Sequence, residues 1–257
     1  MTYAKRRIVV IVKTYPNLSR KYVETVCVAG LADGGKWIRI FPVRFRQLPF
    51  WRKFKKFDII EAEVEPDLDK YSRVESHNVK DTTINIIGHL PTKEDNWQKR
   101  KELLLSHLDK SIETLEVERD SKHKSLGIIK PKEIIDFYKK RTDEIRDWER
   151  DLIQGTQLTL GGEKYTSPLD KIPYWIGYKF KCDDETCKGH NMMCEDWELL
   201  ELFRVMKEKY KDDEIAFGKV KDKYFNWMIE KRDPYFIVGT ESRWNNFIII
   251  SVFYPPK

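Results

Sequence analysis

The sequence predicts an α+β protein: a small closed β-barrel over residues 1–90, a helical connecting segment over 91–154 and an α+β module over 155–257. Three observations support this. Short β-branched and aromatic runs separated by turn residues fill the first ninety positions. A helical hydrophobic period begins after Pro91. A Cys/His cluster lies between a predicted strand and a predicted helix in the last third of the chain.

The barrel prediction depends on the number and spacing of the expected strands. They cover residues 7–12, 22–31, 36–41, 58–65, 73–79 and 83–90, and "ADGG" at 32–35 has the composition of a hairpin turn. Five or six strands in about ninety residues fit a barrel of the OB type, which leaves no strand edge exposed.

The remaining elements follow from hydrophobic spacing. A helix is expected over residues 92–119, and a second is expected to begin at Pro131 and to carry Ile134, Tyr138, Ile145, Trp148 and Leu152 on one face. The last hundred residues predict a β-turn segment at 155–165, a strand at 174–182, helices at 195–210 and about 218–230, and strands at 235–240 and 247–254.

Composition narrows the class of protein. The chain is 40% hydrophobic and 13% aromatic, which is too apolar for an intrinsically disordered protein. No apolar run approaches the roughly 20 residues that a membrane helix needs. We therefore expect a soluble, cytoplasmic protein that has no contact with a membrane. One isolated and three clustered cysteines are not a disulfide framework, and in a reducing compartment such a cluster favours metal binding.

Positive charge is concentrated near the N-terminus. The whole chain has a net charge of +6, yet residues 1–60 carry fourteen Lys or Arg against three acids. The stretch "KWIRIFPVRFRQLPFWRKFKKF" (36–57) holds eight basic side chains, seven aromatic ones and no acid. Basic groups neutralise phosphates and aromatic rings stack on unpaired bases, so this stripe predicts a nucleic-acid interface.

Strand alternation places Trp37, Arg39 and Phe41 opposite the apolar pair Ile38 and Ile40. If the isoleucines face the barrel interior, one arginine lies between two outward rings. The alternative is that Trp37 packs under the central helices while Arg39 pairs with an acid. The predicted nucleic-acid-binding residues are Trp37, Arg39, Phe41, Arg44, Arg46, Arg52, Lys53, Lys55 and Lys56.

The cluster "FKCDDETCKGHNMMCEDWE" (180–198) has the spacing of a zinc site, with Cys182, Cys187, His190 and Cys194 as the predicted ligands. Zinc takes four tetrahedral nitrogen or sulfur ligands, and a glycine-bearing turn lets a short segment wrap one ion. One alternative is a three-ligand site of Cys182, Cys187 and His190. The other is that no metal binds, with Cys194 an ordinary buried residue and His190 capping a turn. Asp196 and Glu198 are candidate catalytic acids, although two acids in the first turn of a helix also satisfy the helix dipole.

Several segments together resemble an uncharacterised prokaryotic family of dual-OB-domain proteins: "KTYPNLSRKYVETVCVAG", "GKWIRIFPVRFR", "SLGIIKP", the Cys/His cluster with "DWE", and "YFIVGT" with "FIIISVFYPP". The resemblance implies two OB-type domains and an association with nucleic acid in defence or mobile-element loci, with a possible protein partner from the same operon. It brings no enzymatic activity with it. On the family pattern, Cys182, Cys187, Gly189, His190, Asp196, Trp197 and Glu198 match, whereas Cys194 is not clearly part of it.

The functional expectation is a protein that binds single-stranded or distorted nucleic acid and carries a structural zinc ion. Two other classes remain open. One is a metal-dependent nuclease that uses His190, Asp196 and Glu198, and the other is a module that senses a nucleotide or a protein partner. Turnover would separate the enzyme from the binding protein, and nucleotide-specific binding that is insensitive to salt would identify the sensor.

Overall fold

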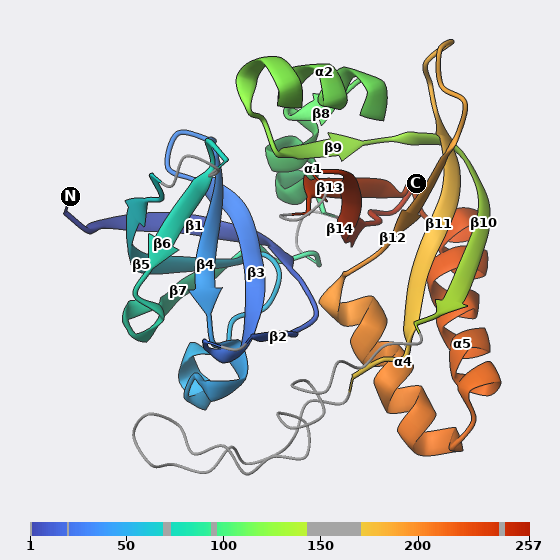
Figure 1. The fold of residues 1–257 in the computed structure, drawn as a ribbon, viewed down its shortest axis with the longest axis horizontal. Coiled ribbons are helices and arrows are strands. Elements are labelled where there is room, and N and C mark those ends of the chain that lie inside the picture. The colour runs from blue at the N-terminus through green and yellow to red at the C-terminus, as the bar shows by residue number, and fades with distance from the viewer. Residues whose placement is uncertain (1, 20, 69–72, 94–96, 143–170, 242–244) are drawn as a thin grey trace.

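The computed structural model describes residues 2–19, 21–68, 73–93, 97–142, 171–241 and 245–257. The protein is a mixed α+β molecule in which an N-terminal barrel lies beside a larger part made of two sheets and several helices (Figure 1). The predicted β-turn segment at 155–165, and the positions of Ile145, Trp148 and Leu152, lie outside the described residues.

Five strands close the barrel: β1 (Ala4–Lys13), β3 (Val23–Ala32), β4 (Trp37–Val43), β6 (Ser76–Val79) and β5 (Asp58–Pro66). They pair around the ring in that order, and β5 returns to β1. Only the β4–β6 pair is parallel among these neighbours. Two further strands extend the sheet, since β2 (Asn17–Ser19) pairs with β3 and β7 (Asn85–His89) pairs with β5.

The predicted strands of the first ninety residues are confirmed, because their residues alternate as a barrel requires. In β5 every second side chain is buried, which places Ile60, Ala62 and Val64 inside and leaves Glu61 and Glu63 on the outside. The short 3₁₀ turns η1 (Phe45–Gln47), η2 (Phe50–Arg52) and η3 (Asp81–Thr83) connect the strands.

Strand β1, from Ile8 onward, and strand β3 are buried on both faces. One face supplies the barrel core through Ile8, Val10 and Val28. The other face joins a second apolar cluster with the C-terminal part, which contains Ile11, Val12, Ala29, Leu31, Leu126, Ile128, Ile237, Ile248 and Ile250. The outer wall of the barrel at these strands is therefore an internal surface of the molecule.

The expected helix over 92–119 is interrupted in the structure. Helix α1 (Gln98–Leu105) ends before the short strand β8 (Leu108–Asp109), and α2 (Ile112–Lys122) begins after it. Ser111 starts α2, because its hydroxyl accepts the Thr114 N–H at 3.2 Å. Leu108 shares the helical spacing but belongs to β8 and is 45% exposed.

The helix expected from Pro131 is wrong for the described residues, because this segment is strand β10 (Pro131–Arg141). Ile134, Ile135, Phe137 and Tyr138 are β-branched or aromatic, and proline is tolerated as the first residue of a strand. β10 pairs along its length with β11 (Tyr174–Cys182), which pairs with β12 (His190–Met193). Within residues 97–142, which the structure describes, the helices of the connecting segment are therefore α1 and α2.

A second sheet in the C-terminal part has the order β14-β13-β9-β8, where β9 is Leu126–Ile129, β13 is Tyr235–Thr240 and β14 is Phe247–Phe253. Helices α4 (Trp197–Tyr210) and α5 (Asp213–Lys221), the π-helical turn η4 (Asp222–Trp227) and α6 (Met228–Lys231) complete this part. Phe203, Val220 and Tyr224 share one apolar cluster with Phe137 and Tyr178 of the β10–β11–β12 sheet. Among the described helices, none has the length and apolar character to cross a bilayer.

Gly239 in β13 provides the space for a barrel side chain. A Cβ atom at this position would lie 2.5 Å from Arg39 Nη2 and 2.7 Å from Ile250 Cδ1. Because both neighbours are buried, neither can move away without disturbing the packing between the two parts. We expect Gly239→Ala to lower the free energy of unfolding by about 1–3 kcal/mol, measured by urea denaturation.

Gly218→Ala is the matched control for this substitution. Gly218 lies in α5, and a Cβ atom there would meet nothing within 4 Å. Alanine in an open helical position is expected to be neutral or to stabilise the protein by up to about 1 kcal/mol. Equal unfolding free energies for the two variants would show that the contact at Gly239 is not tight.

Candidate metal centre and candidate nucleic-acid interface

Three side chains of the β11–β12 hairpin and one side chain of α2 converge at one point. Cys182 ends β11, Cys187 lies in the connecting loop, His190 begins β12, and Glu113 lies in the first turn of α2. One ligand atom from each lies within 4.8 Å of the others. His190 Nε2 is 3.3 Å from Cys187 Sγ and 3.2 Å from Glu113 Oε1.

The hairpin loop brings its two cysteines together. The Cys187 N–H donates to the Asp184 carbonyl at 3.1 Å, and Asp184 Oδ1 accepts the Thr186 N–H at 3.0 Å. The chain then passes through Gly189 at φ +94°, a conformation that favours glycine, and enters β12. This turn leaves Cys187 Sγ 3.3 Å from the Cys182 backbone nitrogen, where it accepts a hydrogen bond.

Two features of this group fit a metal ion. Glu113 Oε2 is buried and has no hydrogen-bond partner among the described residues, although buried carboxylate oxygens are normally paired. Burial, with a further contribution from Cys187 and Glu113, raises the pKa of the Cys182 thiol to about 12. Such a thiol stays protonated unless a cation replaces the proton. Two sulfurs, one imidazole and one carboxylate are a donor set that zinc accepts.

Cys194 is not part of this group, so its prediction as a ligand is wrong. Residues 190–193 form strand β12, and four extended residues carry the chain about 13 Å away from His190. Cys194 is 2% exposed and lies in the core, where its N–H donates to the Ile176 carbonyl at 2.7 Å. Glu113 replaces it in the group. Sequence reasoning missed this residue because it lies 69 positions before Cys182 and has no distinctive local pattern.

Asp196 and Lys56, predicted for different sites, form a buried ion pair between the barrel and the C-terminal part. Lys56 Nζ lies 2.7 Å from Asp196 Oδ2, which also accepts the Ser251 hydroxyl at 3.0 Å and the Val252 N–H at 2.8 Å. Asp196 Oδ1 accepts the Glu198 N–H at 2.8 Å and caps α4. Both carboxylate oxygens are therefore occupied by structural bonds.

These bonds change the roles of three predicted residues. Lys56 is only 8% exposed and does not contribute to a surface. Glu198 lies on the exposed side, 3.1 Å from Lys56 Nζ. Within the described residues, the group around His190 contains neither Asp196 nor Glu198, so the three side chains of the nuclease hypothesis do not meet at one metal position.

Arg39 is buried and Trp37 is partly buried, so the outward platform is not formed and the alternative in which Trp37 packs inside the molecule is favoured. Arg39 is 5% exposed and donates to the Ser125 hydroxyl at 3.1 Å and the Ser125 carbonyl at 2.8 Å. The same Ser125 hydroxyl donates to buried Glu75 at 2.8 Å. Trp37 packs beside His107, with ring centroids 5.9 Å apart. The C-terminal part covers this wall of the barrel.

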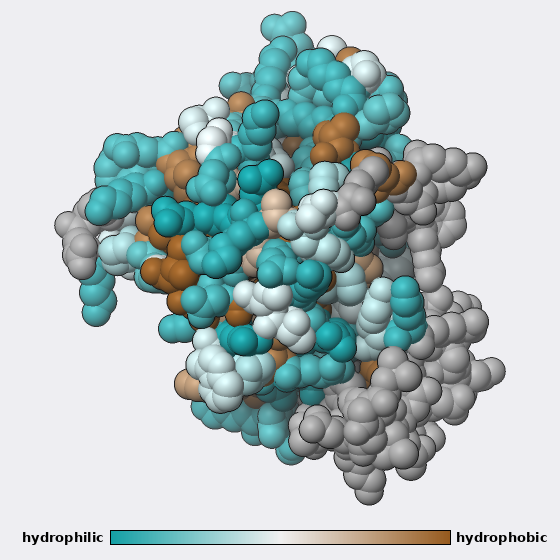
Figure 2. All heavy atoms as spheres, turned by 90° about the vertical axis from the view of Figure 1, so that its left-hand side faces the viewer, coloured by the Kyte–Doolittle hydropathy of each residue, from teal (hydrophilic) through white to brown (hydrophobic). Residues whose placement is uncertain are grey.

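The exposed part of the predicted stripe lies around η2. Phe50 is 88% exposed and Trp51 is 73% exposed, values that are unusual for such large apolar side chains. Lys53 and Lys55 follow within four residues and are exposed as well. We call these four residues the η2 surface. The barrel side of the molecule shows hydrophobic patches set among hydrophilic residues (Figure 2).

The other predicted residues of the stripe are less exposed than Phe50 and Trp51 or have partners within the protein. Phe41 is 45% exposed and meets Tyr22 edge to face. Arg44 pairs with Asp81 at 2.8 Å and Arg46 with Glu24 at 2.8 Å, so part of their charge is already balanced. Arg52 donates to the Thr82 carbonyl. Phe50, Trp51, Lys53 and Lys55 are therefore the exposed residues close together around η2, whereas Arg44, Arg46 and Arg52 contact other residues of the protein.

The fold and sites define a two-part α+β protein with a closed five-stranded barrel, a Glu/Cys/Cys/His group and an exposed aromatic pair. Comparison with protein families agrees with this division. Residues 4–106 match a family described as a domain of unknown function (DUF8758), and residues 108–257 match a second domain of unknown function (DUF8757). The second match covers more than half of the chain, so the protein belongs to the DUF8757 family. Comparison with curated proteins gave no match.

The Lys56–Asp196 pair predicts a strong effect of Asp196→Ala on stability. Removing the carboxylate leaves Lys56 buried without its main partner and also removes the cap of α4. We expect the free energy of unfolding to fall by about 3–5 kcal/mol. Asp212→Ala is the control, because Asp212 caps α5 in the same way at an exposed position and should cost only about 1 kcal/mol. Similar losses in urea denaturation would mean that Asp196 acts only as a cap.

The same pair fixes the direction of a pH effect. Burial alone would raise the pKa of Asp196, but Lys56 and the hydrogen bonds from Val252 and Ser251 hold that pKa below its ordinary value. The stabilisation from Asp196 is therefore complete above its unfolded pKa of about 4 and is lost as the pH falls below it. The stability advantage of the parent protein over Asp196→Asn should shrink below about pH 4, whereas a constant difference would contradict this.

Proposed function

We propose that this protein binds single-stranded nucleic acid on the η2 surface of an OB-like barrel, and that a structural zinc ion stabilises its C-terminal part. The observation that carries the binding proposal is the exposure of Phe50 and Trp51, at 88% and 73%, next to Lys53 and Lys55. Exposed rings stack on unpaired bases whatever their sequence, and lysines neutralise the adjacent phosphates.

The barrel architecture supports the same proposal. Five strands form a closed ring with one parallel pair, and small barrels of the OB type bind oligonucleotides at the strand faces and the loops between them. In this chain the wall of β3 and β4 around Arg39 lies against the C-terminal part. The connection between β4 and β5, which contains η2, therefore supplies the binding residues instead.

The zinc proposal rests on the geometry of Glu113, Cys182, Cys187 and His190. A tetrahedral zinc site places its ligand atoms about 3.3–3.8 Å apart, and two of the separations are 3.2 and 3.3 Å. All four atoms lie within 4.8 Å of one another, so small side-chain shifts would complete the coordination. A zinc ion with four protein ligands has no open coordination position for a catalytic water, which favours a structural role.

The binding proposal predicts different effects for a ring and for a charge. Trp51→Ala should weaken the binding of a single-stranded oligonucleotide by about 1–3 kcal/mol and leave its salt dependence intact, because stacking is lost but no phosphate contact. Lys53→Gln should lower the slope of log K against log salt by about 0.7. Fluorescence anisotropy at several salt concentrations measures both.

Trp175→Ala is the control for Trp51→Ala. Trp175 is 53% exposed on β11, with Lys140 Nζ 5.9 Å from its ring, so it reproduces an exposed tryptophan beside a lysine away from η2. Its substitution should leave affinity unchanged. If the parent protein binds no DNA or RNA in a salt-dependent manner, the nucleic-acid proposal is wrong.

The zinc proposal predicts about one zinc ion per chain by elemental analysis. Cys187→Ser and Glu113→Gln should each lose the metal and lower the melting temperature, because a structural ion contributes directly to folding. Cys194→Ala should keep the metal, and so should Glu116→Gln, which changes an exposed acid on the same helix. Zinc that survives Glu113→Gln but is lost in Cys194→Ala would overturn this ligand set.

A further inference from the structure

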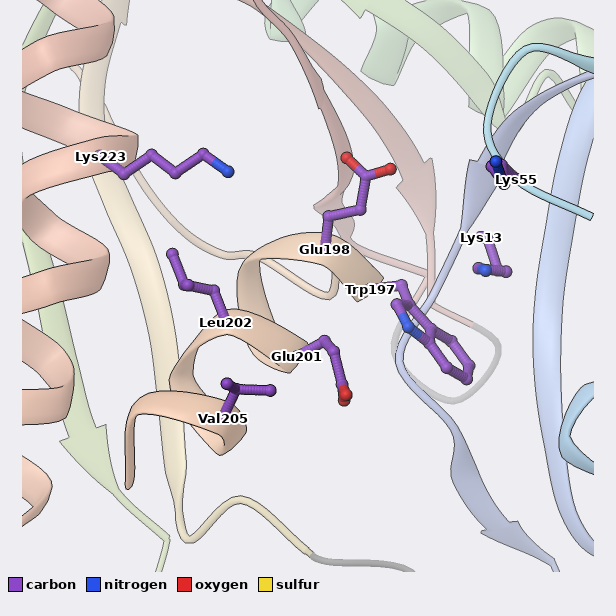
Figure 3. Close-up of a pocket in the computed structure, with 8 residues that line it drawn as sticks. All are labelled: Lys13, Lys55, Trp197, Glu198, Glu201, Leu202, Val205 and Lys223. Atoms are coloured by element: carbon purple, nitrogen blue, oxygen red, sulfur yellow. The ribbon is translucent and has the colours of Figure 1, made fainter. Parts of the chain in front are cut away.

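An open cleft of about 410 Å³ lies where α4 meets the barrel. Its lining is formed by Lys13 of β1, Lys55, Lys223 of η4, and Trp197, Glu198, Glu201, Leu202 and Val205 of α4. Lys13 and Lys55 lie on the barrel side of Trp197, and Lys223 reaches in from the opposite side toward Glu198 (Figure 3). The volume is that of a site for a small molecule rather than for a single ion.

Three lysines and two glutamates line the cleft, so positive charge is in excess among its lining residues. Of its two acids, Glu201 lies 2.7 Å from Arg204 Nη2, and Glu198 lies 3.1 Å from Lys56 Nζ, which it shares with Asp196. For Lys13, Lys55 and Lys223, no carboxylate oxygen of the described residues lies within 4.0 Å of the ammonium nitrogen. Three lysines without an ion pair among the described residues therefore line one open space, beside two acids that each have a cation nearby.

Lys13 is the most unusual of the three lysines. It is 8% exposed, and its ammonium group lies 4.0 Å from the ring centroid of Phe45 and 4.5 Å from that of Trp197. It donates one hydrogen bond, to the Phe54 carbonyl at 3.3 Å, although an ammonium group has three donors. Buried charges are normally paired, and no carboxylate of the described residues contacts this ammonium group at the edge of the cleft.

We propose that the cleft binds the phosphoryl group of a nucleotide, with Lys13 and Lys55 on one side of that group and Lys223 on the other. The nucleotide is either the phosphorylated end of a bound strand or a free mononucleotide. Leu202 and Val205 supply an apolar wall for its sugar or base. This inference deepens the proposed function. It rests on the proposed function only where the phosphate belongs to a bound strand, because a free mononucleotide could bind the cleft without one.

The position of Lys55 connects the cleft with the η2 surface. Lys55 lines the cleft and is four residues after Trp51, so the two are separated by about 14 Å at most along the chain. A strand whose bases stack on Phe50 and Trp51 can therefore place its terminal phosphate in the cleft. The phosphate oxygens would occupy the donors of Lys13 for which the described residues provide no acceptor.

Burial lowers the pKa of Lys13 to about 8, while Glu198, Asp196 and Asp58 act to raise it and Lys56 adds to the lowering. The lysine thus loses its charge near pH 8 in the absence of ligand. A phosphate monoester is already dianionic there, so its affinity should fall as the pH rises from about 7 to about 9. In Lys13→Met this dependence should disappear.

The test compares an oligothymidylate that carries a terminal phosphate with the same oligonucleotide that has hydroxyl ends, and adenosine monophosphate with adenosine. We expect the phosphate to tighten binding about tenfold in at least one pair. Lys13→Met and Lys223→Met should each abolish this gain. Lys223 is exposed on η4, so its variant remains informative if Lys13→Met fails to fold. Lys36→Met, in the exposed β3–β4 hairpin, should keep the full gain.

The outcomes separate this inference from the proposed function. Binding of the hydroxyl-ended oligonucleotide without any gain from phosphate overturns the cleft and leaves strand binding intact. Lys13-dependent binding of adenosine monophosphate without binding of any oligonucleotide supports the cleft and removes the strand. A phosphate gain that survives in both Lys13→Met and Lys223→Met overturns the assignment of the site.

Discussion

The buried ion pair between Lys56 and Asp196 is the interaction on which the arrangement of the molecule depends. Lys56 immediately precedes the β5 region of the barrel, and Asp196 begins α4 and accepts hydrogen bonds from Ser251 and Val252 of β14. One carboxylate thus joins the barrel, a helix and a sheet at a single buried point. The charges of the pair satisfy each other, because an isolated buried ion would cost several kcal/mol. The position of α4 in turn sets the cleft, since five of the cleft's lining residues belong to this helix.

Local sequence patterns predicted most strands and the longest helix of the described residues, α4, correctly. β5 and β11 alternate or carry β-branched and aromatic residues, and α4 has both an apolar stripe and an aspartate cap. The segment from Pro131 failed because Ile134, Tyr138 and their neighbours fit either period over a short window. Its pairing with β11, more than thirty residues later, decided the outcome. Tertiary contacts outweigh local propensity in such ambiguous runs.

The site predictions also succeeded where the residues are close in sequence and failed where they depend on distant elements. Cys182, Cys187 and His190 are close in sequence, so their spacing was informative, and the structure brings them together. Glu113 comes from another element, and no spacing rule points to it. Arg39 and Lys56 were assigned to a surface because their neighbours are basic and aromatic. The burial of both faces of β1 was nevertheless visible in the nearly continuous apolar run "IVVIV" at 8–12, which is typical of a strand covered on two sides.

The place of Glu113 in the metal group has a consequence for chain entropy. A zinc ion held by Cys182, Cys187 and His190 alone would close a loop of only eight residues within one hairpin. With Glu113 as a ligand, the ion acts as a cross-link that closes a loop of 69 residues. That span is about three doublings longer, which corresponds to about 2 kcal/mol more restriction of the unfolded chain. The ion would then stabilise β9, β10 and β11 together, because all three strands lie inside the loop that it closes.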